Sequence, residues 1–374
     1  MDATARTAPP PAGGSAAPTA AHNTWHRLRV TRLERPAPDA VAVTLALPED
    51  LAPAFAFRAG QHVTVRHRAD GRELRRTYSA CPPPGEPAAL RLVVKRLGPG
   101  GFADHAQHVL AEGDTLDVAP PTGTFRLADH PGAHHVMVAG GSGITPLSAM
   151  AAAALRDDPA CRVSVLHAAR DARSALLADE LSDLKDAHLD RFCALHVLSR
   201  EAQAAGLLSG RADAARLRSL LALLEADPAD EDTHFYLCGP QGLVTAARET
   251  LLGAGAGRDR VRQELFAADG TFAPPPADPA APGRRITVRL AGRTTTTTTD
   301  PADRSLLDTV VRARPEAPYS CRAGLCGTCR AKVVRGSVTT PPRTAPGTAE
   351  QTDGYVLTCR TAPDSAALEL DFDA

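Results

Sequence analysis

The chain has 374 residues, which is more than one hydrophobic core of ordinary size accommodates, so we expect about two or three domains. Its 42 basic and 43 acidic residues nearly cancel, which argues against nucleic acid as a partner. No stretch approaches the length of a membrane-spanning helix. Cys81, Cys161, Cys193 and Cys238 follow no pairing pattern, which favours a cytoplasmic protein with reduced thiols.

The first part of the chain contains a polar tail and then short alternating segments. Residues 1–22 are mostly Ala, Pro, Thr, Gly and Ser, so we expect a disordered tail. Residues 23–130 show a period of two, which predicts strands at 28–31, 41–45, 63–65, 74–78, 90–94 and 116–118. Their number and turn-rich spacing predict a small antiparallel β-barrel, with one helix over 103–111.

The fourth of these strands contains Arg76-Thr77-Tyr78-Ser79. Side chains alternate along a strand, so Arg76 and Tyr78 share one face while Thr77 and Ser79 share the other. A guanidinium suits a pyrophosphate, and a phenol ring packs well on a flat heterocycle. Taken alone, the tetrapeptide is equally typical of an ordinary half-buried strand.

Residues 131–266 alternate between expected strands (135–139, 163–168, 192–198, 235–238) and expected helices (146–155, 174–185, 212–224, 243–252). This order predicts a doubly wound α/β domain with a parallel sheet. Gly140, Gly141 and Gly143 follow the first strand, and Pro146 suits the first position of the next helix. Strand, glycine loop and helix together indicate a pyrophosphate-binding loop, whereas the glycines alone would indicate a turn.

The segment after the second of these strands bears on the choice of coenzyme. Arg170, Arg173 and Ser174 favour the 2′-phosphate of NADPH, whereas Asp171 is the residue type that favours the free ribose hydroxyls of NADH. The balance predicts NADPH and leaves NADH possible.

The last part of the chain carries a metal-binding pattern. Residues 267–283 contain five prolines and predict an extended linker. In residues 284–374, a strand hairpin (286–290 and 294–299) and a helix over 306–311 precede Cys321, Cys326 and Cys329, and Cys359 follows. The C-x4-C-x2-C spacing with a distant fourth cysteine is the plant-type pattern for a [2Fe–2S] cluster. A structural zinc site usually pairs two short knuckles, and only one is present.

Together these motifs resemble the ferredoxin–NADP reductase superfamily, whose flavin motif is Arg-x-Tyr-Ser, followed by a β-grasp domain like that of plant-type ferredoxins. The resemblance implies that Arg76 holds the FAD pyrophosphate, Tyr78 packs on the isoalloxazine ring, and Ser79 reaches its N5 atom. It assigns the rest of the flavin site to Thr77, Val93, Lys95, Gly100, Gly101 and Phe102. It also implies that Thr145, Cys238, Gly239 and Pro240 lie on the nicotinamide side, and that Glu264 lies beside the flavin.

A hydride carries two electrons and a [2Fe–2S] cluster accepts one, so a flavin is needed between them. We therefore predict an oxidoreductase that passes electrons from NADPH to FAD, to the cluster and to an outside acceptor. Segments 59–62, 75–79, 140–146 and 370–373 resemble the family of phenylacetyl-CoA epoxidase reductase subunits, which implies a di-iron, multi-subunit oxygenase as partner. A reductase of a Rieske oxygenase such as ketosteroid 9α-hydroxylase, and a non-catalytic redox sensor or electron carrier, stay open as alternatives.

Three cations flank the cluster cysteines, namely Arg322, Arg330 and Lys332. We expect them to surround the point where the electron leaves and to face an acidic patch on the oxygenase, because complementary charge speeds encounter. Ordinary surface charge is the alternative interpretation.

Overall fold

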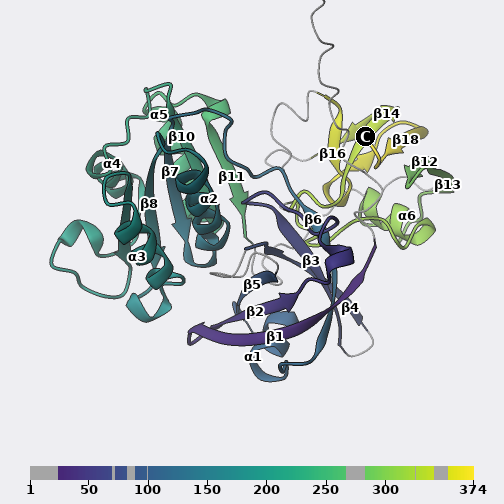
Figure 1. The fold of residues 1–374 in the computed structure, drawn as a ribbon. Helices are drawn as coiled ribbons and strands as arrows, with labels where there is room; N and C mark the ends of the chain where they lie inside the picture. Colours follow the sequence, from purple (N-terminus) through teal and green to yellow (C-terminus); the bar gives the residue numbers. More distant parts are fainter. Residues whose placement is uncertain are drawn as a thin grey trace, which may run out of the picture.

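A computed structural model describes residues 24–69, 72–81, 89–98, 100–266, 283–324, 326–340 and 353–374. The expected tail over 1–22 lies outside the described residues, as does the expected linker apart from Gly283. The chain forms three β-sheet units, and the first lies between the other two (Figure 1). None of the helices in the described ranges is long and apolar enough to cross a membrane.

The first unit is a six-stranded antiparallel sheet in the order β4-β3-β6-β1-β2-β5. Its elements are β1 (His26–Ala37), β2 (Ala40–Ala46), β3 (His62–Ala69), β4 (Arg72–Ser79), β5 (Ala89–Lys95), α1 (Gly101–His108) and β6 (Thr115–Thr122). Backbone hydrogen bonds between Cys81 and Arg91 (3.1 and 2.8 Å) join the two edge strands. The sheet therefore closes into the predicted barrel, around a core that includes the fully buried Val63 and Val65.

The second unit is a five-stranded parallel sheet in the order β11-β10-β7-β8-β9. Its elements are β7 (His134–Gly140), α2 (Ile144–Asp157), β8 (Arg162–Ala169), α3 (Ala178–Ala187), β9 (Phe192–Leu198), α4 (Ala214–Leu223), β10 (Thr233–Gly239), α5 (Gln241–Gly253) and β11 (Val261–Leu265). The chain leaves β7 toward β8 and β9, and later returns on the other side as β10 and β11. The strand order therefore reverses between β7 and β10, which is where such sheets bind ligands.

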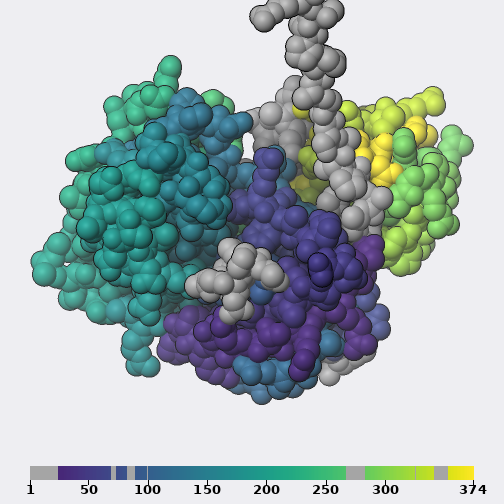
Figure 2. Space-filling view, viewed as in Figure 1, coloured from purple at the N-terminus to yellow at the C-terminus, as the bar shows by residue number. Residues whose placement is uncertain are grey.

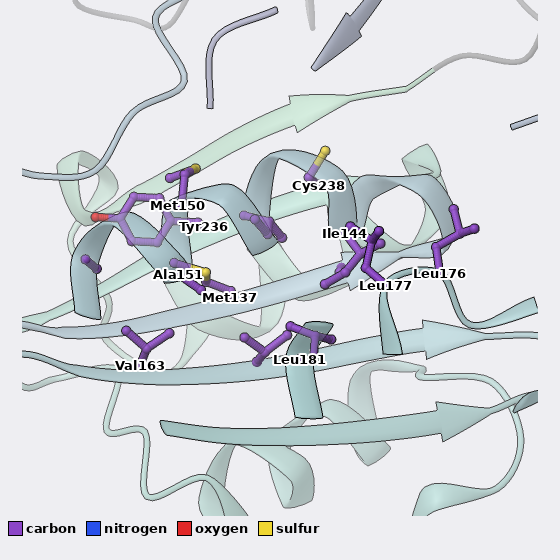
Figure 3. Packing of buried hydrophobic residues seen from close by; sticks show 14 of the residues in the cluster. Met137, Ile144, Met150, Ala151, Val163, Leu176, Leu177, Leu181, Tyr236 and Cys238 are labelled. Carbon is purple, nitrogen blue, oxygen red and sulfur yellow. The ribbon is translucent and has the colours of Figure 1, made fainter. Parts of the chain in front are cut away.

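Helices cover both faces of this parallel sheet, as the doubly wound prediction requires. On one face α2 packs through residues such as Ile144 and Met150 in a core that also contains Met137, Tyr236 and Cys238 (Figure 3). On the other face α4 and α5 pack in a separate core through residues such as Leu220 and Leu251. The carboxyl edge of the sheet is thus held in place from both sides.

Two details of this unit differ from the prediction. The helix expected from residue 174 begins at Ala178, because Asp171 and Ser174 cap a separate 3-10 turn at Ala172–Ser174. The side chain of Asp171 accepts a hydrogen bond from the Ser174 amide (2.9 Å). The Ser174 hydroxyl accepts from the Asp171 amide (3.2 Å) and donates to the Asp171 carbonyl (3.0 Å). In addition, the segment with Glu264 forms a fifth parallel strand that the alternation did not indicate.

The third unit is a mixed sheet in the order β13-β12-β18-β14-β16 with one helix. Its elements are β12 (Arg285–Leu290), β13 (Arg293–Thr298), α6 (Leu306–Ala313), β14 (Arg330–Arg335), β15 (Val338–Thr339), β16 (Tyr355–Leu357), β17 (Ala362–Pro363) and β18 (Ala367–Asp371). The threonine run pairs with β12 as the predicted hairpin, because Thr is β-branched and suits a strand. Strand β18 lies parallel to β12, and α6 packs on the sheet through Leu306 and Val310, as in a β-grasp fold.

The barrel and the parallel-sheet unit are joined next to the point of barrel closure, and Figure 2 shows their contact on one face. Arg91 on β5 forms a two-pronged ion pair with Glu180 on α3, with both distances at 2.7 Å. The Cys81 thiol donates to the carbonyl of Thr145 at 3.5 Å. The end of the predicted flavin strand is therefore fixed against the glycine loop.

The buried histidines of the parallel sheet predict how stability depends on pH. Burial, reinforced by nearby cationic groups, lowers the pKa of His134 and His135 from 6.5 to about 4 each, and that of His167 to about 3. In the unfolded chain these histidines take up protons near pH 6.5, before the folded chain can. The free energy of unfolding should therefore fall as the pH drops from about 6.5 to about 4.

We expect the melting temperature of the cofactor-loaded protein, measured by calorimetry, to fall steadily across this window. The slope should be shallower in His134→Gln, which removes one titrating group. A melting temperature that stays constant or rises between pH 6.5 and pH 4.5 would contradict this account of the buried histidines.

Candidate functional site

The glycine loop after β7 and the turn after β10 press against each other at the switch point. A Cβ atom added to Gly143 would lie 2.1 Å from the carbonyl oxygen of Cys238, and one added to Gly140 would lie 2.6 Å from Pro240 Cδ. Glycine is therefore required at both positions for steric reasons. Gly141 has φ +53°, and no described atom lies within 4 Å of its added Cβ, so this side of the loop is open to a ligand.

Thr145 and Cys238, which are predicted to lie on the nicotinamide side, are both buried at this junction. The Thr145 hydroxyl donates to the Ser142 carbonyl at 2.9 Å. Cys238 is fully buried, and the neighbouring strand places Glu264 directly beside it. Burial first, and then Glu264, raise the pKa of the Cys238 thiol well above its ordinary value. Cys238 is therefore a neutral thiol and not a nucleophilic thiolate at physiological pH.

Strands β3, β4 and β11 bring three polar side chains to one place. His62 is the cross-strand neighbour of Ser79, and its Nδ1 atom lies 3.5 Å from Glu264 Oε1. The Ser79 hydroxyl and the second Glu264 oxygen are buried without a hydrogen-bond partner among the described residues. Buried polar atoms usually have partners, so these two atoms point to a ligand that supplies them. The isoalloxazine ring of FAD, with its polar edge, fits this requirement.

Other predicted flavin residues lie on β4 and at the start of α1. The Tyr78 ring packs on Phe102 with the centroids 5.6 Å apart. Gly100 and Gly101 have φ values of +80° and +73°, which turn the chain into α1. Arg76 donates to the carbonyl of Arg75 at 2.9 Å. Phe102 is fully buried in the barrel core and supports the Tyr78 ring from within.

The positions of Thr77, Val93 and Lys95 complete the predicted flavin set. Thr77 is half-buried on β4 between Arg76 and Tyr78, and Val93 is buried on β5. Lys95 Nζ lies 3.5 Å from Asp39 Oδ1, and the same Asp39 also pairs with Arg170 of the parallel-sheet unit. Lys95 and Arg170 thus share one carboxylate at the junction of the two units.

A cavity of about 320 Å³ lies between the two units, beyond the ends of β8 and β9. It is lined by Pro38, Asp39, Arg170, Asp171, Arg173, Ser174 and Arg200. Arg173 and Arg200 are exposed, and neither is paired with a carboxylate among the described residues. The Ser174 hydroxyl is already used in the turn with Asp171, so the arginines are the groups left to bind an anion.

Sequence reasoning missed His62, Asp39 and Arg200. For Arg200 a signal was available: it follows β9, and neighbouring parallel strands end at the same edge of the sheet. Asp39 belongs to a turn of the barrel, and only the packing of the two units brings it into the coenzyme cavity.

The four predicted cluster cysteines come together in two pairs. The thiol of Cys326 lies against Cys321, and that of Cys329 lies against Cys359. No three Cys, His, Asp or Glu side chains of the described residues surround a single point, as the ligands of one ion would. Two pairs of thiols suit a cluster in which each of two irons takes two thiolates.

Local backbone geometry prepares this loop for sulfur ligands. The amides of Ala323 and Cys326 each donate to the sulfur of Cys321 at 3.4 Å, and the Thr328 hydroxyl donates to the sulfur of Cys326 at 3.1 Å. Cys329 and Cys359 are buried, whereas Cys321 and Cys326 are partly exposed. The residues present therefore fit a [2Fe–2S] cluster with one edge near the surface.

The three cations near the cluster are divided between two tyrosines. Arg330 and Lys332 lie over the ring of Tyr355 at 4.2 and 5.5 Å. Arg322 instead lies over Tyr319 at 4.4 Å and donates to Asp308 at 2.6 Å. Arg322 is thus held by an ion pair within the domain while 38% of its side chain stays exposed, and its role toward an outside partner remains a prediction.

Comparison with known proteins agrees with this division of the chain. Three families match: the oxidoreductase FAD-binding domain over residues 27–127, the oxidoreductase NAD-binding domain over 137–249, and the 2Fe-2S iron-sulfur cluster binding domain over 288–364. The chain is 34% identical to one of the subunits that make up the 1,2-phenylacetyl-CoA epoxidase of Escherichia coli, over 94% of this chain and 98% of the relative. The chain belongs to the family of 1,2-phenylacetyl-CoA epoxidase E subunits.

Other members of the wider group extend the comparison. The ferredoxin reductase component of 3-ketosteroid-9-alpha-monooxygenase from Rhodococcus rhodochrous is 28% identical, over 92% of this chain and 96% of the relative. The solved structure of phthalate dioxygenase reductase superposes with a TM-score of 0.57 and 26% identity, over 93% of this chain and 98% of that chain. Family membership confirms the predicted oxidoreductase with FAD, NAD(P)H and a [2Fe–2S] cluster as cofactors.

The cysteine pairs predict the effect of removing one ligand. Cys326→Ala should lose the cluster, because a pair that is left with one thiolate cannot hold its iron. Iron and acid-labile sulfide should fall to background, while FAD content and NAD(P)H-dependent ferricyanide reduction persist. Cys193→Ala, which changes an exposed cysteine, is the control. Full retention of two irons in Cys326→Ala would refute the assignment.

The contact between the two loops predicts the effect of a single methyl group. Gly143→Ala must displace the Cys238 carbonyl, and overpacking of this kind costs about 1–3 kcal/mol. We expect KM for NAD(P)H to rise roughly tenfold, with FAD content unchanged. Gly253→Ala, at the end of α5 with open space around it, should leave KM unchanged. If both variants keep the wild-type KM, the loop does not form the coenzyme site.

Proposed function

We propose that this chain is the reductase component of a multicomponent oxygenase, and that electrons pass from NADPH through FAD and the [2Fe–2S] cluster to the oxygenase. In this proposal residues 23–130 bind FAD, 131–266 bind the coenzyme, and 284–374 hold the cluster. The observation that carries it is the position of β4. Cys81, two residues beyond its C-terminal end, contacts Thr145 just after the glycine loop, and the middle of the strand contacts the cluster domain through Arg75.

The residues of the chain have distinct tasks in this scheme. Bound FAD supplies the step that converts a hydride into single electrons. Ser79 and Glu264 present the unsatisfied polar atoms toward the flavin, and His62 holds Glu264 in place. The neutral Cys238 thiol and the packed loops exclude water from the place where the nicotinamide would lie.

The identity of the oxygenase is the finer part of the proposal. Identity of 34% over nearly the full length favours a di-iron, multi-subunit phenylacetyl-CoA epoxidase as partner. A Rieske oxygenase of the ketosteroid 9α-hydroxylase type is the second candidate, supported by the 28% identity of its reductase component. A non-catalytic sensor would not need the open coenzyme loop that the structure contains.

The test of partner identity is reconstitution. The purified chain, NADPH and the oxygenase subunits of a phenylacetyl-CoA epoxidase should convert phenylacetyl-CoA to an oxygenated product detectable by mass spectrometry. Oxygenation only with a ketosteroid oxygenase and its steroid would favour the second candidate. A chain that does not oxidise NADPH or NADH with ferricyanide or cytochrome c would be a sensor or carrier instead.

The arginines of the coenzyme cavity predict the preference for NADPH. Replacing both Arg173 and Arg200 by Gln removes two cations that have no carboxylate partner among the described side chains. Each charge-assisted hydrogen bond to a phosphate is worth about 1.5–3 kcal/mol, so the loss of two such bonds should raise KM for NADPH roughly a hundredfold or more. KM for NADH, which lacks the 2′-phosphate, should change little.

Arg156→Gln is the matched control, because Arg156 is an exposed arginine of the same unit that is paired with Asp157 outside the cavity. Equal changes in KM for NADPH and NADH in the double variant would contradict NADPH preference. Asp171 would then indicate NADH as the coenzyme.

A further inference from the structure

Arg75 on β4 connects the barrel to the cluster domain. Its guanidinium donates to the carbonyls of Ala317 (3.3 Å) and Pro315 (3.4 Å), more than two hundred residues further along the chain. The same group lies over the ring of Tyr319 at 4.0 Å. Only 7% of Arg75 is exposed, so these contacts are largely shielded from water.

The barrel holds this guanidinium in a fixed orientation. Glu73 accepts from Arg75 Nε at 2.8 Å, and the ring of Trp25 lies 5.2 Å from its central carbon. All three nitrogens of the guanidinium therefore have an acceptor: one is a carboxylate of the barrel and two are carbonyls of the cluster domain. A planar fork used in this way is specific to arginine, because a lysine offers a single point charge.

The segment that Arg75 holds leads directly into the cluster loop. Tyr319 lies two residues before Cys321, and Arg322 on the other side of that cysteine lies over the same ring. Within the cluster domain the segment is fixed by Arg314, which pairs with Glu316 at 2.5 Å and donates to the carbonyl of Leu290. A change in the position of Arg75 would therefore be transmitted to the partly exposed Cys321.

On the barrel side, the same strand continues from Arg75 into the flavin motif. Arg76, Tyr78 and Ser79 are its next neighbours on β4. One strand thus carries both the predicted flavin contacts and the contact with the cluster loop. We propose that Arg75 is a positioning residue that fastens Tyr319 and the cluster loop to the flavin strand, and so sets the approach for each single electron that leaves reduced FAD and reduces the oxidised cluster.

The proposal rests on the proposed function, and the structure offers a matched control for it. Arg66 is the cross-strand neighbour of Arg75, lies over the same Trp25 at 4.5 Å, and pairs with Asp117 at 2.9 Å. Its described contacts all lie within the barrel. Arg66→Gln therefore removes an equivalent guanidinium without touching the cluster domain.

The experiment uses the full-length protein loaded with FAD and cluster. Under anaerobic conditions, NADPH is mixed with this protein in a stopped-flow instrument. Reduction of the flavin and reduction of the cluster are followed separately by absorbance. In Arg75→Gln, hydride transfer to FAD and ferricyanide turnover should match wild type. Reduction of the cluster should slow roughly tenfold or more, because a shielded cation–π contact and two charged hydrogen bonds are lost.

A second measurement does not depend on activity. Small-angle X-ray scattering should give a larger radius of gyration for Arg75→Gln than for wild type and Arg66→Gln, because the cluster domain is released from the barrel. Tyr319→Leu, which removes the cation–π contact and leaves the two carbonyl hydrogen bonds, should slow cluster reduction less than Arg75→Gln, whereas Tyr319→Phe, which keeps the ring, should behave like wild type. The double variant Arg75→Gln/Tyr319→Leu should be no slower than Arg75→Gln alone, because the cation–π contact is already lost in that variant.

Three outcomes would overturn the proposal. The first is a wild-type rate of cluster reduction and a wild-type radius of gyration in Arg75→Gln. The second is loss of FAD or of hydride transfer in that variant, which would make Arg75 a flavin-site residue. The third is an equal effect of Arg66→Gln. If instead NADPH fails to reduce the cluster in the wild-type protein, the proposed function itself is wrong.

Discussion

The pairing of Cys81 with Arg91 closes the barrel, and the arrangement of the whole chain depends on this closure. The same two residues fasten the parallel-sheet unit, through the Thr145 carbonyl and through Glu180. Earlier on β4, Arg75 fastens the cluster domain. Strand β4, the residue Cys81 just beyond its end and the paired strand β5 therefore fix the coenzyme loop and the cluster loop relative to the flavin motif between them. Electron transfer needs fixed positions of this kind, because the coenzyme, the flavin and the cluster must lie close to one another.

Burial determines the chemistry of the groups at these junctions. It raises the pKa of Cys81 to about 12 and that of Cys238 well above its ordinary value, so both thiols stay neutral. Two other buried groups, the Ser79 hydroxyl and one Glu264 oxygen, are left without partners among the described residues. The first feature keeps these two thiols from ionising, and the second reserves hydrogen-bonding capacity for a ligand.

Local patterns predicted the three units, the cluster cysteines and the glycine loop, because strand alternation, ligand spacing and tight turns are encoded in neighbouring residues. The contacts between units were not predictable in this way. His62, Asp39 and Arg200 join the candidate sites only when distant strands are packed together. Arg322 looked like a surface charge in the sequence, yet Asp308, fourteen residues earlier, holds it within the domain. The start of α3 was missed because the Asp171 and Ser174 side chains form a separate turn.

The most direct test of the electron path uses protein that contains the cluster but has been stripped of FAD. NADPH should leave the cluster of this protein oxidised and silent in electron paramagnetic resonance. Addition of FAD should give the signal of the one-electron-reduced cluster within the same sample, because the two electrons of the hydride can pass to the cluster one at a time only through the flavin. Reduction of the cluster by NADPH in the absence of FAD would contradict the account.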